Sequence, residues 1–192
     1  MINKPNDWDS VPAEYGSSFG PNRLPLANYI CKIVAATPYT SKKGNNLLRI
    51  AWDVAEGDYM DFYYQKFTAE KKEKGKAAKW KPAGTYYVSL SNTGRLKGFA
   101  ECLEKGNPGY KWDFDDTRLA GLKFAGQMSG ENKEFNGHEY LDVKLANIYP
   151  LGDFKSMPKA FMRKPSGDNI APEADSNPFA EGNSVPDEEI PF

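Results

Sequence analysis

Apolar and polar residues alternate along five short stretches of this chain, and this alternation limits the folds that the chain can adopt. The stretches cover residues 29–35, 48–54, 85–90, 122–128 and 141–145. A period of two places successive side chains on opposite faces, which is typical of strands buried on one side. Polar turns separate the stretches, and Asn136-Gly137 before the last one favours a hairpin between the final two strands. The sequence therefore predicts a sheet of five short strands.

One further stretch has helical spacing and lies between the third and fourth predicted strands. Its apolar stripe has the spacing i, i+3, i+4 and i+7 and consists of Leu96, Phe99, Ala100 and Leu103. Asn92 or Thr93 can cap its start, and Gly106 can end it because Pro108 follows closely. Five strands with a helix after the third follow the plan of the OB-fold, a partly open barrel that the helix closes at one end.

The sequence thus predicts a mainly β protein, a five-stranded OB-fold barrel with one helix, over residues 24–152. An α+β sheet with the same elements is the alternative. Residues 1–23 are polar and rich in Pro, Gly and Ser, which predicts a flexible, irregular N-terminal arm. From residue 153 the chain is predicted to form a basic linker and then a disordered acidic tail, which begins at Pro165.

The net charge of -1 hides a division of charge along the chain. Residues 165–192 contain seven acids and no Lys or Arg, so this tail carries -7. The preceding residues hold all 25 Lys and Arg and the other 19 acids, which gives them +6. A basic body with an acidic tail favours binding to a polyanion with which the tail competes.

Several classes of protein are excluded by composition. No run of about 18 apolar residues could span a membrane, and the N-terminus has no apolar signal region, so we expect a cytoplasmic protein. Cys31 and Cys102 sit in apolar segments and are expected to be reduced, packed thiols. With a single His and no Cys pair at ligand spacing, we expect neither a metal nor a cofactor.

Single-strand binding needs cations along a groove and rings on which bases stack, and one part of the chain concentrates both. The candidates there are Tyr63, Tyr64, Lys66, Phe67, Lys71, Lys72, Lys74, Lys76, Lys79, Trp80, Lys81 and Tyr86. Lys32 and Arg49 project from the polar faces of the first two predicted strands and could line the same surface. We expect residues 66–81 to form an exposed loop. The alternative is a solvated lysine loop beside rings that belong to the core.

An enzyme is the other class to weigh. Asp53, Glu56, Asp58 and Asp61 form an acidic cluster after the second predicted strand, and a metal-dependent nuclease needs carboxylates that converge on a metal. The solvated end of a strand explains this cluster more simply. The sequence also lacks a phosphate-binding Gly-Lys loop and a nucleophile with an evident base, so we expect no enzymatic activity.

The last six residues combine three acids, an apolar pair around a proline and a terminal aromatic ring. They are Asp187, Glu188, Glu189, Ile190, Pro191 and Phe192. This segment resembles the C-terminal tip of bacterial and phage single-stranded DNA-binding proteins, which end in acids followed by Ile-Pro-Phe. The resemblance implies that these residues bind partner proteins of replication, recombination or repair. Such a peptide suits a basic pocket that accepts a ring.

The body of the chain resembles a second group, a family of small phage proteins from the replication modules of phages of Gram-positive bacteria. Its members are usually described as single-stranded DNA-binding or are left without a function. The similar segments are 26–33 (LANYICKI), 52–57 (WDVAEG), 96–99 (LKGF) and 107–112 (NPGYKW). The resemblance spans roughly residues 24–153 and implies a phage or prophage origin, with the host cytoplasm as the location.

Together these features predict a single-stranded DNA-binding protein of phage replication and recombination. It would coat single strands without strong sequence preference and recruit partners through its tip. The alternative is an OB-like interaction protein that mimics the host tail and binds DNA weakly. The sequence leaves open a homo-oligomer, the site size, and the preference between DNA and RNA.

Overall fold

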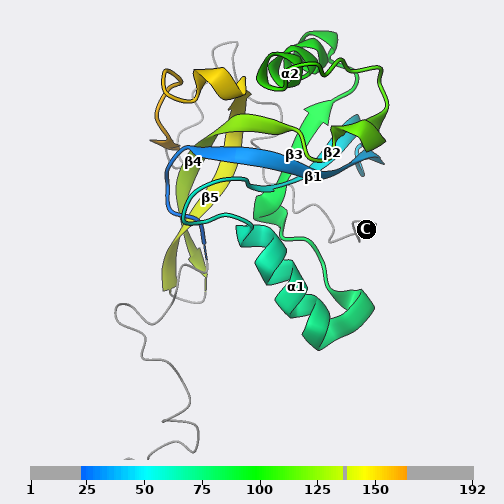
Figure 1. Ribbon diagram of the computed structural model, residues 1–192. Coiled ribbons are helices and arrows are strands. Elements are labelled where there is room, and N and C mark those ends of the chain that lie inside the picture. The colour runs from blue at the N-terminus through cyan, green and yellow to red at the C-terminus, as the bar shows by residue number, and fades with distance from the viewer. Residues whose placement is uncertain (1–22, 136–137, 164–192) are drawn as a thin grey trace, which may run out of the picture.

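The computed structural model describes residues 23–135 and 138–163, which form a mixed α/β fold with a six-stranded sheet and two α-helices (Figure 1). The strands are β1 (Tyr29–Thr40), β2 (Asn46–Val54), β3 (Thr85–Ser89), β4 (Lys123–Phe135), β5 (His138–Tyr149) and β6 (Phe161–Met162). The helices are α1 (Phe62–Lys74) and α2 (Thr93–Gly106), with 3-10 turns η1 (Gly75–Ala77), η2 (Pro82–Gly84), η3 (Asp116–Leu119) and η4 (Leu151–Asp153). The predicted acidic tail with its tip, the Asn136-Gly137 turn and nearly all of the predicted N-terminal arm lie outside the described residues.

The sheet contains the five predicted strands in the order β3-β2-β1-β4-β5, and all of these neighbours pair antiparallel. The sheet does not close into the predicted barrel, because no pairing joins β3 to β5 within the described residues. Instead η2, immediately before β3, packs against β5. The sheet is therefore open between its two end strands, and the insertion that separates β2 from β3 contributes to filling the gap.

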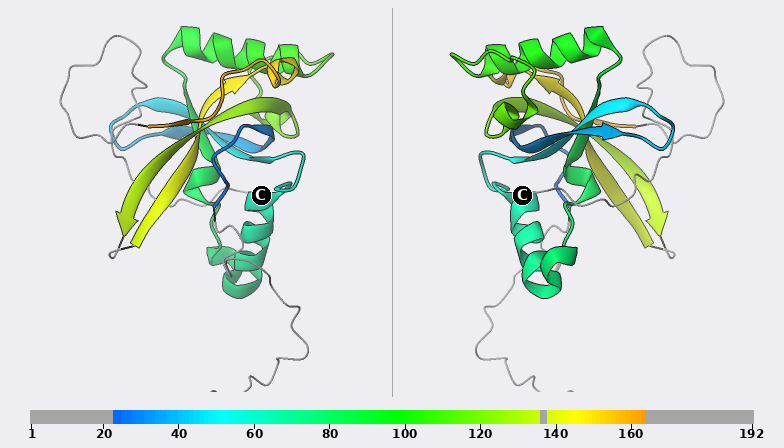
Figure 2. Two further views of the ribbon diagram at one scale, coloured as in Figure 1. Left: turned by 90° about the vertical axis from the view of Figure 1, so that its left-hand side faces the viewer. Right: turned by 90° about the vertical axis from the view of Figure 1, so that its right-hand side faces the viewer.

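The predicted helix is confirmed as α2. Phe99 and Leu103 of its apolar stripe are buried against the sheet. Asn92 caps it, since its side-chain oxygen accepts a hydrogen bond from the Arg95 backbone N–H at 3.1 Å. Figure 2 shows α2 along one end of the sheet and α1 at the opposite end.

The second helix, α1, lies where the sequence predicted an exposed loop. Its residues are mostly strong helix formers, Lys, Glu, Gln and Ala, but only Tyr63 and Phe67 are buried. Two apolar positions one turn apart are too few to make a helical stripe visible in the sequence. The prediction of a single helix is corrected accordingly.

Asp53 explains why α1 begins where it does. Its Oδ1 accepts hydrogen bonds from the backbone N–H of Val54 at 2.8 Å and Tyr63 at 2.9 Å, and its Oδ2 accepts one from Tyr64 N–H at 2.8 Å. The side chain is 0% exposed, so the predicted solvated strand end is wrong at this residue. Burial raises the pKa of Asp53, and the three N–H donors oppose that shift. The carboxylate thus ties the end of β2 to the first turn of α1.

We expect Asp53→Asn to lower the free energy of unfolding by about 2 kcal/mol. The side-chain NH2 group of Asn would then lie against a buried backbone N–H group, and neither of these two donors could accept a hydrogen bond from the other. Urea denaturation followed by circular dichroism measures this. Asp61→Asn is the matched control, since Asp61 is only half-buried, pairs with Lys32 at 2.5 Å and has a φ of 59° that Asn tolerates. The control should cost less than about 1 kcal/mol. Equal losses in the two variants would show that Asp53 does not hold the helix in place.

The edge of β4 beyond its pairing with β1 is covered by the end of the described chain. β1 pairs with β4 only as far as Gly126, and β6 then pairs in parallel with Ser129 and Gly130. Arg163 adds two hydrogen bonds, from its backbone N–H to the Gly130 carbonyl at 2.7 Å and from its Nε to Ser129 Oγ at 3.0 Å. A side chain at Gly130 would collide with Met162, because its Cβ would lie 2.9 Å from the sulfur.

Candidate nucleic-acid interface

Three of the predicted stacking rings, Tyr63, Phe67 and Trp80, are buried in the core. Trp80 is 4% exposed, its ring centroid lies 6.3 Å from that of Tyr63 and 5.8 Å from that of Phe67, and its Nε1 donates to the Gly84 carbonyl at 3.0 Å. The Tyr63 ring in turn packs edge-on against Trp52 at 5.2 Å. None of these rings has a face that a base could reach, so the stacking role predicted for them is corrected to a structural one.

Tyr86, another predicted stacking ring, is half-buried and lies on the core-facing side of β3. Its register partner on β2 is Ile50, which faces the core, and burial raises the pKa of Tyr86. Among the predicted rings, Tyr64 alone is well exposed, at 51%, on the outside of α1.

The predicted lysines between residues 66 and 81 lie on and after α1, and part of their charge is compensated. Glu70 pairs with Lys74 at 3.0 Å and also with Lys81. Lys66 lies 4.3 Å from the centroid of the Phe62 ring. The pKa of Lys66 is lowered by burial and by the nearby charges of Lys81 and Arg23. Lys71, Lys72, Lys74 and Lys76 are exposed, whereas Lys79 is half-buried.

Lys32 and Arg49 share the face of the sheet opposite to that of Leu48, Ile50 and Trp52, here called the outer face. Arg49 opposes Thr37 of β1, and Lys32 opposes Asp53 of β2. The start of α1 covers this face at the Lys32 end, because Asp53 binds the first turn of the helix and Lys32 pairs with Asp61. Arg49 lies farther along this face and is half-buried between Leu47 and Ala51, which are 4% and 2% exposed.

Two tyrosines that the sequence analysis did not select flank Arg49. The rings of Tyr39 on β1 and Tyr87 on β3 lie 5.9 Å apart with a tilt of 49°. The guanidinium carbon of Arg49 is 5.5 Å from the centroid of the Tyr39 ring, and Tyr87 is the register partner of Arg49. All three side chains are half-buried, so each keeps an accessible surface.

The turn between β1 and β2 adds positive charge beside these rings. It closes through hydrogen bonds between Ser41 and Asn45, from Ser41 N–H to the Asn45 carbonyl at 2.9 Å and from Asn45 N–H to Ser41 Oγ at 3.0 Å. Lys42 and Lys43 are exposed at its tip. We call the surface formed by Tyr39, Lys42, Lys43, Arg49 and Tyr87 the hairpin platform.

Comparison with known proteins assigns no role to the hairpin platform. A scan against models of known protein families finds no match for the chain, and a search of curated proteins finds none either. The chemistry of the site therefore rests on its own residues.

Electrostatics favour an anionic ligand at the hairpin platform. Residues 24–52 and 82–100, which form β1, β3 and nearly all of β2, contain no Asp or Glu. The absence of acids over both segments is the sequence signal that could have located the site. A second signal is that Tyr87, and not Tyr86, alternates with the polar residues Thr85 and Ser89. Cations there can hold phosphates, and the aromatic rings beside them can stack bases.

The acids considered for a nuclease are held by different partners. Glu56 pairs with Lys123 at 2.8 Å and Asp61 with Lys32, while Asp53 binds backbone N–H groups. Residues 23–135 and 138–163 contain no cluster of three or more His, Cys, Asp or Glu that could hold a metal ion. Cys31 and Cys102 are free and buried, as expected. In the part of the chain that the structure describes, neither helix has the length and apolar character to cross a membrane.

Proposed function

We propose that this chain is a phage-type single-stranded DNA-binding protein that holds the strand on its hairpin platform. The observation that carries the proposal is the pairing of Tyr39 and Tyr87 around Arg49, within two chain segments, residues 24–52 and 82–100, that contain no Asp or Glu. Each stacked base contributes on the order of 1–3 kcal/mol, and the rings accept any base because every base has a flat face. Binding without strong sequence preference follows from this chemistry.

The strand order gives the proposal a structural context. A sheet ordered β3-β2-β1-β4-β5, with a helix between the third and fourth strands, follows the plan of an OB-fold that is left open. We propose this as the fold type. In OB-folds the face of the second and third strands and the turn between the first two strands bind oligonucleotides. The hairpin platform occupies the same region.

The lysines of α1 are proposed as a second, weaker contact with the strand. They can supply charge, but the rings between them are buried and Glu70 offsets part of the charge. The single-stranded DNA would therefore gain its stacking energy on the sheet and only electrostatic attraction at α1.

We further propose that the tip, Asp187 to Phe192, recruits replication, recombination or repair proteins in the host cytoplasm. The support for this is the resemblance of the last six residues. The alternative function is an interaction protein that mimics the host tail and binds DNA weakly. It would show partner capture through the tip without appreciable affinity for single strands.

Salt dependence tests the proposal. Fluorescence anisotropy with labelled oligo-dT should show tight binding and much weaker binding to a duplex of equal length. Replacing three platform cations in one variant (Lys42→Ala, Lys43→Ala, Arg49→Gln) should flatten the log-log salt slope by about 2, since each phosphate contact to a single strand contributes about 0.7. The matched triple variant of α1 (Lys71→Ala, Lys72→Ala, Lys74→Ala) should flatten the slope by less than about 1. A larger effect from the α1 variant would place the main binding surface on α1. A wild-type protein without affinity for single strands would favour the alternative function, the interaction protein that mimics the host tail.

A further inference from the structure

Phe114 is the most exposed large apolar residue of the described chain, and its backbone is strained. The side chain is 75% exposed, and φ is +68°, in the left-handed region that bulky residues rarely adopt. A strained backbone and an exposed ring both cost free energy and persist only where the surrounding structure imposes them, and such residues cluster at binding sites. The loop that carries Phe114 is therefore a candidate binding surface.

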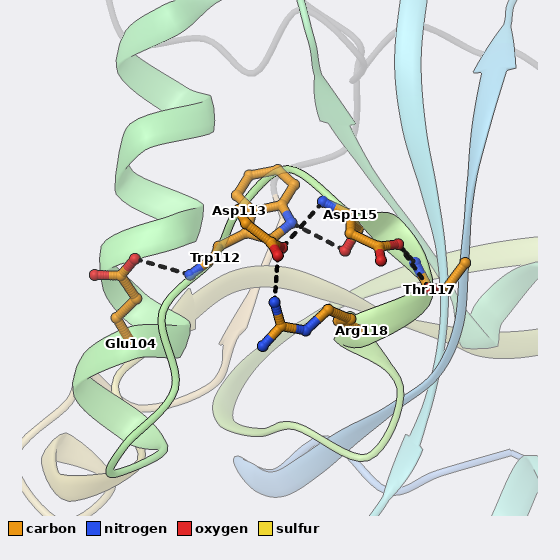
Figure 3. A network of polar contacts seen from close by, with 6 residues as sticks. All are labelled: Glu104, Trp112, Asp113, Asp115, Thr117 and Arg118. Atoms are coloured by element: carbon orange, nitrogen blue, oxygen red, sulfur yellow. Dashed lines mark hydrogen bonds and ion pairs between the residues drawn. The ribbon is translucent and has the colours of Figure 1, made fainter.

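A network of polar contacts holds this loop in one shape (Figure 3). Asp113 accepts a hydrogen bond from Asp115 N–H at 3.4 Å and pairs with Arg118. Asp115 in turn accepts from the backbone N–H and hydroxyl of Thr117 at 2.9 and 2.6 Å, while its carbonyl accepts from Trp112 Nε1 at 3.2 Å. The loop is thus fixed from both sides of Phe114.

The Phe114 ring rests on a stack of aromatic rings that reaches α2. Its centroid lies 5.0 Å from that of Trp112, which packs edge-on against Phe99 of α2 at 5.8 Å. Glu104 of α2 also accepts a hydrogen bond from Trp112 N–H at 3.2 Å. A ring presented on a rigid support loses little conformational entropy on docking, which is the property of an interface anchor.

The charge around Phe114 selects the chemistry of the partner. Asp113, Asp115 and Asp116 flank the ring, and Arg118 compensates only one of them directly. A phosphate backbone would be repelled here. The loop fits a protein surface that combines positive charge with a shallow apolar hollow.

The same chain carries such a surface on α1. A shallow, open hollow there is lined by Tyr64, Gln65, Thr68, Ala69, Lys72 and Glu73. Residues 62–81 hold seven Lys and two Glu, so the surroundings of the hollow are strongly positive. The lysines around the hollow complement the acidic Phe114 loop in charge.

The helices α1 and α2 lie at opposite ends of the sheet (Figure 2), and Glu104 ties the start of the Phe114 loop to α2. We propose that the Phe114 loop of one copy docks on the α1 hollow of the next. Such a contact joins two different surfaces, so it repeats head to tail and builds a row of copies instead of closing a two-fold dimer.

Sedimentation velocity over a concentration series, without DNA, tests the contact independently of the proposed function. The wild-type chain should self-associate, and Phe114→Ala should weaken the association about 30-fold, as expected for an aromatic anchor. Phe161→Ala is the matched control, since its ring is 40% exposed on β6 and outside both surfaces, and it should leave the association unchanged. Unchanged circular dichroism and unfolding temperature establish that each variant is folded. A wild-type chain that stays monomeric at every concentration, or equal behaviour of the two variants, would overturn the proposal.

Charge exchange identifies the docking partner of the loop. Asp116→Lys and Lys72→Glu should each weaken self-association by about ten-fold, because each places like charges across the contact. The double variant should recover at least part of the loss, since every contact then pairs the exchanged charges. Additive losses in the double variant would overturn docking on α1.

Discussion

Replacing Tyr39 and Tyr87 together with alanine is expected to lower affinity for single-stranded oligo-dT by at least about 30-fold. Each ring stacks one base, and two stacked bases contribute at least about 2 kcal/mol. The salt slope should stay nearly unchanged, because loss of stacking releases few counterions. Anisotropy titrations at several salt concentrations measure both quantities.

Two controls make this result specific. Tyr64→Ala removes an exposed ring of the same kind from α1 and should leave affinity for short oligonucleotides close to that of the wild type. Tyr39→Phe with Tyr87→Phe keeps both ring faces and should retain most of the binding. Normal affinity in the folded double alanine variant would remove the hairpin platform from the proposed function.

Trp80→Ala is expected to lower the free energy of unfolding by about 3–5 kcal/mol, the range for a large buried aromatic residue replaced by alanine. The indole packs against Tyr63 and Phe67, and its N–H donates to the carbonyl of Gly84. Its removal leaves a cavity and an unpaired carbonyl at once. Urea denaturation gives the loss, and Trp80→Phe should lose less because it fills most of the cavity.

The DNA affinity of the folded Trp80→Ala protein should remain close to that of the wild type. This follows because Trp80 is buried away from the hairpin platform. A variant that keeps its stability but loses affinity for single strands would reinstate Trp80 as a stacking ring.

Alternation and helical spacing located the five long strands and α2 because each of these elements buries one face. In β2 the alternating residues Leu48, Ile50 and Trp52 enter the core, although Leu47, Ala51 and Asp53 on the other face are buried as well. Sheet closure could not be predicted in the same way. It depends on which chain segment fills the gap between β3 and β5. That segment includes η2, which packs against β5, and the sequence of η2 has no periodic pattern that would predict this contact.

The candidate site was predicted less well than the fold, for a physical reason. Residues 59–67 contain five aromatic residues, and this density marks the residues that attach α1 to the core as readily as it marks a stacking surface. Tyr86 and Tyr87 differ by one position, and a one-residue difference in a strand exchanges the two faces of the sheet. Arg49 was selected correctly as an outward-facing cation because its neighbours Leu48 and Ile50 are clearly apolar.

The short strand β6 has a consequence for any attempt to shorten this chain. Without Phe161 to Arg163, the Ser129–Gly130 part of β4 would present unpaired backbone N–H and carbonyl groups along an uncovered sheet edge. Exposed edges of this kind recruit strands from other molecules and lead to aggregation. A truncation designed to remove the acidic tail should therefore end after Arg163, so that precipitation is not mistaken for an effect of the tail.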